Sequence, residues 1–319
     1  KKAQRNNVMK WALKITLLVP IFLASFAGIS QTTDSQLAAH YYQNNEYEKA
    51  LLYYNRLYSK QANTSNYNYL FKCLVKLENY GEARKLSKRH VRIDPINQKA
   101  KVDYGYTYGL EGNEKAQSKE FKKLIKAIPP NYQVINELAA AFLEIKRNQE
   151  ALDVYQEGRS VMKNTYPFNT EIADIYYRME RYDDMTDELL NLLELNPGYL
   201  KTVEGLLNKT AANEKDSPAN KALKKGLIQK INQKPNSMVF SEMLIWVYMQ
   251  EANWSAAFIQ VKALDRRLNE DGRRVYNLAE TLANNKEYAV AADAFEYVVK
   301  IGKKSQYYVE SRIGGLMVR

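Results

Sequence analysis

The stretch from Glu171 to Pro197, EIADIYYRMERYDDMTDELLNLLELNP, decides the fold, because it has the pattern of two amphipathic helices followed by a stop. Ala173 and Tyr176 lie three residues apart on the first helix, and Arg181–Asp183 follows as a polar turn. The second helix carries apolar residues at helical spacing on one face, namely Met185, Leu189 and Leu192. Pro197 ends that helix, since proline lacks a backbone N–H and disfavours helix in the residue before it.

The same pattern recurs along the chain after Gln31. A leading residue, usually small, recurs at Ala38, Phe71, Gly105, Ala139 and Ala173, with intervals of 33, 34, 34 and 34 residues. One such helix pair cannot bury its apolar faces alone, so each copy needs a copy on either side. The pattern therefore predicts a stack of helix pairs, and a chain of 319 residues is a natural length for one.

A 34-residue step with these residues resembles the tetratricopeptide repeat (TPR) family. In that family the small leading residue lies where the two helices of a repeat cross closely. Ala38, Gly105, Ala139 and Ala173 match that position, while Phe71 departs from it. A second small residue, on the second helix of the repeat, is matched by Ala50, Ala83 and Ala151. The resemblance implies an all-α fold: a TPR-like, right-handed α-solenoid of antiparallel helix pairs.

The register of the repeats predicts how the chain is divided. We expect a targeting region at 1–30, repeats one to five at 31–197, a degenerate repeat with an extended turn at 198–236, further repeats at 237–304 and the first helix of a truncated repeat at 305–319, about eight repeats in all. Ile245, the leading residue after the slip, comes 72 residues after Ala173, which is two periods plus four. The degenerate repeat is predicted as helices over Leu200–Ala212 and Ala219–Gln233, with the extra residues in the polar turn Asn213–Pro218.

The N-terminal region has the layout of a secretory signal peptide. A short basic start at Met9 is followed by Ile15–Ile29 without a charge, and small residues precede Gln31. The apolar core is shorter than the roughly 20 residues of a membrane-spanning helix. We expect cleavage near Ser30 and a mature protein outside the cytoplasm, in the periplasm, with membrane contact only through this segment. The alternative is an uncleaved signal anchor.

Composition argues against catalysis and nucleic-acid binding. Residues 31–319 hold 42 basic and 36 acidic residues, a net of +6, and no continuous arginine-rich stripe. The single cysteine, Cys73, lies in a helical pattern and is predicted to be a buried thiol. His40 and His90 lie in different repeats, without partners at metal-ligand spacing, and no phosphate-binding glycine loop occurs. The sequence therefore predicts no enzyme, cofactor or metal.

The candidate binding residues follow from the resemblance, because in the TPR family the first helix of each repeat lines a concave groove that holds peptides. Counted from the repeat framework, the groove-facing positions are Tyr42, Asn68, Lys72, Lys76, Tyr106, Asn136, Tyr177, Arg178, Trp246 and Tyr276. Aromatic rings, amides and cations suit an extended peptide, although each residue alone could simply cover the inner surface. Ser35 and Ala39 stand where some members carry a lysine and asparagine clamp for acidic C-terminal peptides, so that role is not expected.

Two functions remain open. The first is a non-catalytic, extracytoplasmic scaffold that binds a partner protein or peptide in its groove, with the partner and the oligomeric state unspecified. The alternative is the sensor half of a longer signalling protein whose effector domain lies beyond Arg319.

Overall fold

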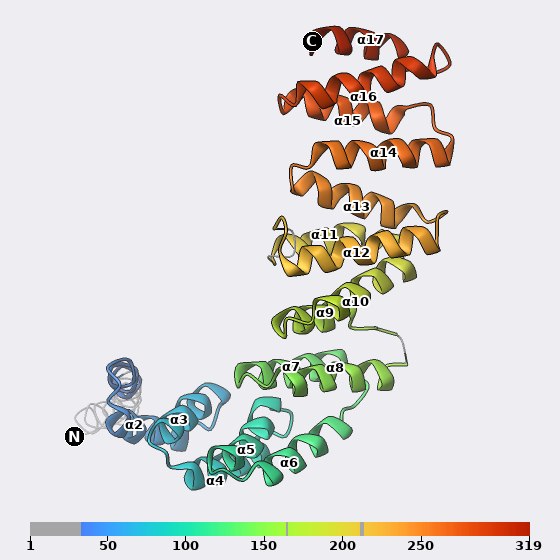
Figure 1. The fold of residues 1–319 in the computed structure, drawn as a ribbon. Helices are drawn as coiled ribbons and strands as arrows, with labels where there is room; N and C mark the ends of the chain where they lie inside the picture. Colours follow the sequence, from blue (N-terminus) through green and yellow to red (C-terminus); the bar gives the residue numbers. More distant parts are fainter. Residues whose placement is uncertain (1–32, 164, 211–213) are drawn as a thin grey trace, which may run out of the picture. The chain divides into compact units, whose positions relative to one another are not determined.

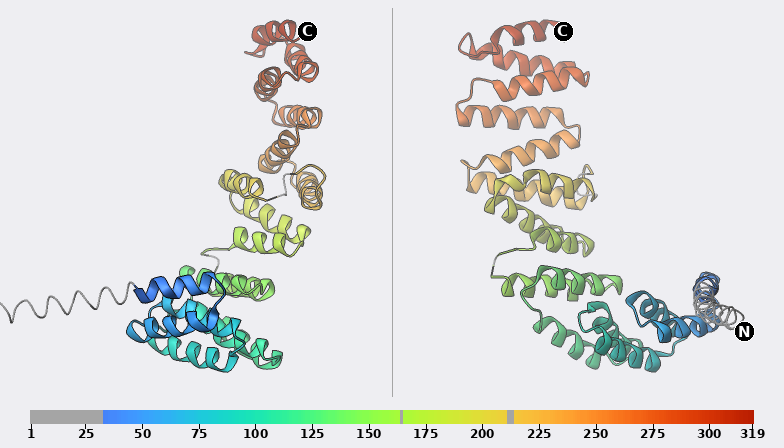
Figure 2. Two further views of the ribbon diagram at one scale, coloured as in Figure 1. Left: turned by 90° about the vertical axis from the view of Figure 1, so that its left-hand side faces the viewer. Right: turned by 180° about the vertical axis from the view of Figure 1, so that it is seen from behind.

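The computed structural model describes residues 33–163, 165–210 and 214–319. In these ranges the chain is helical and contains no strand, as the resemblance implied (Figure 1). It divides into two compact units, with the boundary between Lys163 and Asn164. Each unit is a TPR-like α-solenoid in which successive helices pack antiparallel (Figure 2). The predicted all-α fold is thus confirmed.

The first unit is a run of four helix pairs. Its elements are a helix over residues 33–43 followed by α2 (Tyr47–Lys60), α3 (Thr64–Lys76), α4 (Tyr80–Ile93), α5 (Gln98–Leu110), α6 (Glu114–Lys126), α7 (Tyr132–Glu144) and α8 (Asn148–Val161). Asparagine side chains cap several of these helices: the Oδ1 atoms of Asn63, Asn97, Asn113 and Asn131 each accept from the backbone N–H three residues on.

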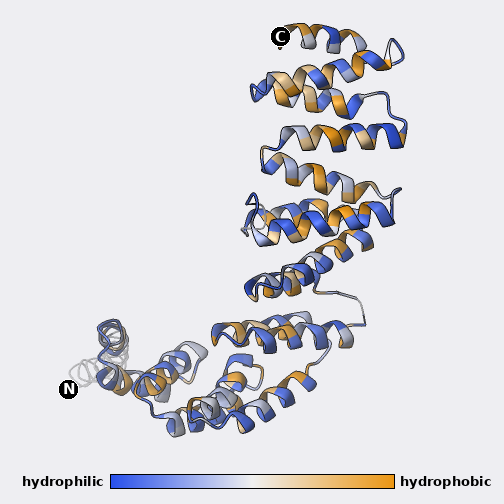
Figure 3. Cartoon of the chain, viewed as in Figure 1, coloured by the Kyte–Doolittle hydropathy of each residue, from blue (hydrophilic) through white to orange (hydrophobic). Residues whose placement is uncertain are grey.

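The second unit continues the alternation. Its elements are α9 (Asn169–Arg178), α10 (Tyr182–Leu195), the 3-10 turn η1 (Pro197–Tyr199), α11 (Leu200–Asn208), α12 (Pro218–Gln233), α13 (Met238–Gln250), α14 (Trp254–Leu268), α15 (Arg273–Asn284), α16 (Tyr288–Ile301) and α17 (Tyr308–Met317). Within each unit, neighbouring pairs bury their apolar stripes against one another, so hydrophobic and hydrophilic residues alternate around the helices (Figure 3).

Small residues let the two helices of a repeat approach each other, as predicted. Ala38, Ala139 and Ala173 have no exposed surface. Gly105 is needed for the same reason, since a Cβ there would lie 2.7 Å from Cε1 of Phe121 on α6. Phe71, which departs from the small-residue pattern, is also buried. Cys73 is a buried free thiol, and burial raises its pKa to about 12.

The turn between the two helices of a pair has a periodic backbone conformation. A residue with positive φ occurs at Asn45, Glu78, Gly112, Lys146, Glu180, Asp216, Ala252 and Lys286. Only one of these is glycine, and a left-handed residue of any other type costs roughly 1 kcal/mol. The helix packing on either side therefore imposes the turn against local preference.

Three local predictions are corrected. The turn placed at Arg181–Asp183 lies earlier, because Tyr182 already starts α10 and Glu180 has a φ of 58°. The predicted helix Leu200–Ala212 ends at Asn208, and Pro218 belongs to α12 rather than to the turn, because the Oγ atom of Ser217 caps that helix. Ala212 and Asn213 lie outside the described residues.

The constant period also hides a shortened helix. α9 begins only at Asn169 and has 10 residues, whereas α3, α5 and α7 have 13. Pro167 accounts for this, since the residue before a proline disfavours helix, and Phe168 then adopts a φ of 52°. The boundary between the two units falls in this link, within the range 31–197 that the sequence treats as one run of repeats.

The predicted targeting region, residues 1–30, lies outside the described residues. Within the described part of the chain, no helix combines the length and the apolar character needed to cross a bilayer.

Candidate functional site

Three predicted groove residues of the first unit lie along one helix. Asn68, Lys72 and Lys76 are spaced four residues apart on α3 and therefore share a face. The Nζ atom of Lys72 lies 3.6 Å from Oε1 of Glu144, at the end of α7. The Oδ1 atom of Asn68 is buried and has no hydrogen-bond partner. The first helices of successive repeats thus converge on this side of the unit.

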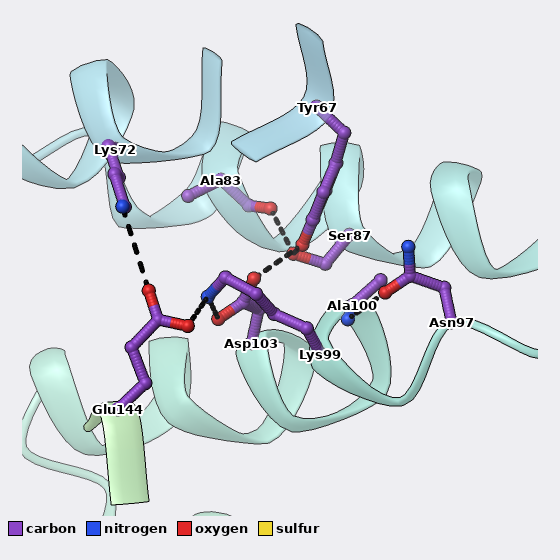
Figure 4. Close-up of polar contacts among 9 residues, drawn as sticks. All are labelled: Tyr67, Lys72, Ala83, Ser87, Asn97, Lys99, Ala100, Asp103 and Glu144. Atoms are coloured by element: carbon purple, nitrogen blue, oxygen red, sulfur yellow. Dashed lines mark hydrogen bonds and ion pairs between the residues drawn. The ribbon is translucent and has the colours of Figure 1, made fainter. Parts of the chain in front are cut away.

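A chain of charged groups joins these helices (Figure 4). The Nζ atom of Lys99, on α5, lies 3.3 Å from Oε2 of Glu144 and 3.1 Å from Oδ1 of Asp103. Tyr67 Oη donates a hydrogen bond of 2.9 Å to Oδ2 of Asp103. The groove-side ion pairs are therefore connected to a polar group within the core.

Asp103 is the unusual member of this chain, because its side chain is only 1% exposed. Burial raises the pKa of this carboxyl to about 6, although the Lys99 ammonium and the Tyr67 hydroxyl both act to lower it. The Tyr67 ring is stacked on His90, with ring centroids 4.2 Å apart, and burial lowers the pKa of His90. Asp103, Tyr67 and His90 connect α3, α4 and α5, so the stability of the fold explains why these polar groups are buried.

The other predicted residues of the first unit have their polar groups or rings engaged within the fold. Asn136 donates to the carbonyl of Tyr132 at 2.9 Å and accepts from Tyr155 Oη at 2.9 Å. Tyr42 makes edge contacts with three tyrosine rings, and Tyr106 packs against the core of the first two repeats. These three residues help to build the groove wall.

In the second unit, three predicted residues are also engaged within the fold. Arg178 Nε donates to Oδ2 of Asp174 at 2.7 Å on the same helix, and the Tyr177 ring lies 6.0 Å from the ring of Tyr182. Tyr276 is stacked on Tyr307, with centroids 4.9 Å apart, and contacts Phe295 edge-on. It therefore packs toward α16 and the residues before α17.

Trp246 is the predicted residue with the clearest binding geometry. It is half-buried rather than exposed, and it lines a shallow hollow of about 350 Å³ on α13, α14 and α15. The apolar lining comes from Ile245, Met249, Val261 and Leu278. α13 and α15 are the first helices of neighbouring pairs, so the hollow lies on the face that the resemblance assigns to the groove.

One edge of the hollow is held by charged groups that the sequence analysis missed. The guanidinium of Arg274 is fixed between two acids, with Nη1 at 2.8 Å from Oε1 of Glu242 and Nε at 2.8 Å from Oε2 of Glu270. Asn277 also lines the hollow, next to the predicted Tyr276. The sequence did indicate that these residues lie near one another, because Arg274 follows Glu270 at i+4 and Asn277 follows Arg274 at i+3.

Within the described residues, no group of three or more His, Cys, Asp or Glu is placed to hold a metal ion. The hollow beside Trp246 offers apolar area, one fixed cation and one side-chain amide, which is the chemistry of binding a side chain and a backbone.

No family model and no curated protein sequence matches the chain. Several solved structures are similar to it. A mutant of MamA is 21% identical, with 53% of this chain and 98% of that chain covered and a TM-score of 0.26. TTC0263, a thermophilic TPR protein in Thermus thermophilus, is 15% identical. The match covers 56% of this chain and 98% of TTC0263, with a TM-score of 0.31. The TPR domain of P58(IPK) is 12% identical. The match covers 91% of this chain and 98% of that domain, with a TM-score of 0.27. The fold assignment therefore rests on the helix pairs and the period of the chain itself.

Proposed function

We propose that this chain is a non-catalytic, extracytoplasmic scaffold that binds an extended segment of a partner protein on the groove side of its helix pairs. The TPR-like fold supports a protein partner in general terms. The extracytoplasmic location is supported by the signal-peptide layout of residues 1–30 alone.

The hollow beside Trp246 carries the proposal. Its lining can bury one apolar side chain of the partner, and an aromatic residue in a partly desolvated hollow is the usual energetic centre of an interface. Asn277 can hydrogen-bond the backbone of an extended peptide. Arg274 is already held by Glu242 and Glu270, so its ordering costs little entropy on binding.

One predicted groove residue of the first unit keeps its charged group available. In the described part of the chain, Lys76 is exposed and has no ion pair. We propose that Lys76 adds a polar contact with a partner.

The test is to select binders from a random peptide library displayed on phage, using the full chain as bait, and to measure their affinities for point variants. We expect Trp246→Ala to weaken the selected peptides by at least about tenfold, as is typical of aromatic hot spots. The matched control is Ile259→Ala, which removes an apolar side chain that is 55% exposed on α14 and lies outside the hollow. Peptides that bind the Trp246→Ala protein as tightly as the parent would show that the hollow is not the binding site.

A further inference from the structure

The second helix of the third pair carries an uncompensated basic face. Lys115, Lys119, Lys122 and Lys126 follow one another at steps of four, three and four residues on α6, so they form one stripe about 16 Å long. All four side chains are exposed, and none has an ion-pair partner among the described residues. Like charges in one stripe repel each other, so the arrangement lowers helix stability unless a partner neutralises it.

The neighbouring helices extend this face. A hollow of about 350 Å³ lies between α4, α5 and α6, and four cations line it: Lys88, Arg92, Lys101 and Lys123. Its only carboxylate, Glu120, makes no ion pair with any of the four in the described structure. Val91 and Leu124 supply its apolar lining. This hollow has the charge and the dimensions to take a phosphate group.

The net charge of residues 31–319 is concentrated on these helices. Residues 80–126 hold 12 basic and 6 acidic residues, a net of +6, which equals the net charge of residues 31–319. The remaining 30 basic and 30 acidic residues of that range cancel. The segment 80–126, which holds α4, α5 and α6, therefore accounts for the net positive charge of residues 31–319.

Two large exposed apolar side chains follow the basic hollow closely in the sequence. Ile93, at the end of α4, is 52% exposed, and Ile96, in the link to α5, is 76% exposed. They closely follow Arg92, which lines the hollow. Cations next to protruding aliphatic side chains are the combination with which peripheral proteins bind anionic membranes.

We propose that the basic face of α4–α6 binds the surface of an anionic lipid bilayer, with lipid phosphates at the lysine stripe and the hollow and with Ile93 and Ile96 entering the headgroup region. This contact is separate from the membrane contact expected of residues 1–30. A bilayer fits better than nucleic acid because Tyr104, the aromatic residue in the lining of the hollow, is already engaged. Tyr104 and Tyr108 are in T-shaped contact, and the Arg84 guanidinium lies 4.1 Å from the Tyr108 ring centroid. These contacts leave less ring surface for stacking on bases.

Co-sedimentation of the full chain with vesicles tests the proposal. One set of vesicles contains phosphatidylglycerol and phosphatidylcholine in equal parts, and the other contains phosphatidylcholine alone. The test variant replaces Lys115, Lys119, Lys122 and Lys126 by glutamine. The control makes the same replacement at Lys209, Lys215, Lys303 and Lys304, which are exposed in the second unit, so both variants have the same net charge and the same N-terminal segment.

We expect the α6 variant to bind the anionic vesicles at least about tenfold more weakly than the parent, and the control to stay within about twofold. High salt should remove the difference. Equal losses in the two variants, equal binding of all three proteins, or a parent that prefers neither kind of vesicle would overturn the proposal. So would tight binding of the parent to a short DNA duplex together with no preference for anionic vesicles.

A second measurement reports insertion independently of the N-terminal segment. Ile96→Cys places a thiol on the surface, while the native Cys73 is buried and should not react. A solvent-sensitive fluorophore on the introduced thiol should shift to shorter wavelength with anionic vesicles, and not in the background of the four α6 substitutions. An unchanged spectrum would mean that the face does not meet a bilayer.

Discussion

Helices α6 and α12 have similar compositions and opposite surroundings. Both are the second helix of their pair and both are rich in lysine. On α6 the lysines face solvent without acids. On α12 they meet acids of the neighbouring helices: Lys224 lies 2.6 Å from Oε1 of Glu251, Lys225 lies 3.2 Å from Oδ1 of Asp183, and Lys230 lies 2.7 Å from Oε2 of Glu194. Composition alone therefore does not say whether a lysine-rich helix forms a binding surface or part of an ion-pair network.

The charges of the two units agree with this contrast. Residues 31–163 hold 21 basic and 15 acidic residues, whereas residues 164–319 hold 21 of each. The second unit uses its lysines to join helices to one another, and the first unit leaves a set of them available to a partner. Each of the following predictions tests one side of that difference.

The largest effect is expected at the buried pair of the second unit. Glu251 has a side chain only 1% exposed, and its Oε2 atom already lacks a partner. Lys224→Met would leave that carboxylate buried without a cation, and we expect a loss of about 3 kcal/mol in the free energy of unfolding. Urea unfolding followed by circular dichroism measures this, because the signal comes from the helices of both units and therefore also reports on the control in the first unit. Lys122→Met on α6 is the matched control and should change stability little; comparable losses would remove the contrast.

The next effect concerns the buried carboxyl of the first unit. The pKa of Asp103 is about 6 in the folded protein and 3.8 without the fold, so the folded state holds this proton more tightly. The protonated Asp103 carboxyl therefore contributes to the free energy of unfolding. This contribution is fully present below pH 3.8 and is lost as the pH rises through 6.

Asp103→Asn should remove this pH dependence. Relative to the variant, the parent should lose roughly 2 kcal/mol of unfolding free energy between about pH 4 and pH 7. Denaturant unfolding followed by circular dichroism at a series of pH values measures the difference. Parallel stability profiles for the two proteins would mean that Asp103 ionises as it does in the unfolded chain.

A smaller effect is expected where α12 meets α10. Glu194 pairs with Lys230 and with Lys234, and hydrogen bonds from these two lysines lower its pKa to about 2. The pairs are partly exposed, so Glu194→Gln should cost less than about 1 kcal/mol at neutral pH. Because the folded pKa is depressed, this contribution is present above pH 4.5 and is lost as the pH falls through 2. High salt should reduce the loss of unfolding free energy that Glu194→Gln causes. A loss that salt does not change would show that packing, and not charge, is responsible.

The smallest effect is expected for the stripe on α6. Replacing Lys115, Lys119, Lys122 and Lys126 by glutamine removes no ion pair in the described chain and keeps good helix formers, so the unfolding free energy should change by less than about 0.5 kcal/mol. Thermal unfolding beside the parent checks this. A large destabilisation would show that the lysines support the fold, which would weaken their assignment to an external surface.

The lining of the hollow in the second unit was only partly predictable. Counting from the repeat framework selected Trp246, which does line the hollow, because the position of a residue in a repeat fixes which side of its helix it occupies. The same count gave Tyr276, but the hollow is lined by the next residue, Asn277, because Tyr276 stacks on Tyr307 from the following pair. Arg274 was missed because its second partner, Glu242, lies 32 residues earlier in the chain, and only packing brings the two side chains together.

The sequence by itself determined the α-solenoid of this protein. A leading residue, usually small, recurs at steps of 33 or 34 from Ala38 to Ala173, beside apolar residues at helical spacing and prolines at the ends of pairs. Stacked helix pairs bury the apolar faces that this pattern creates. These signals are local, each lying within one helix or one turn, so they can be read without coordinates.

Tertiary structure decided everything that depends on residues from different repeats. It placed left-handed turns at Glu78, Lys146 and Glu180, where the sequence offers no glycine, because the packed helices fix the direction of the chain there. It also decided which lysines meet an acid: Lys230 is paired by a glutamate 36 residues away, while Lys122 has no ion-pair partner in the described chain. Electrostatic partners of this kind are set by distance in space, and the sequence of a helix records only its own side chains.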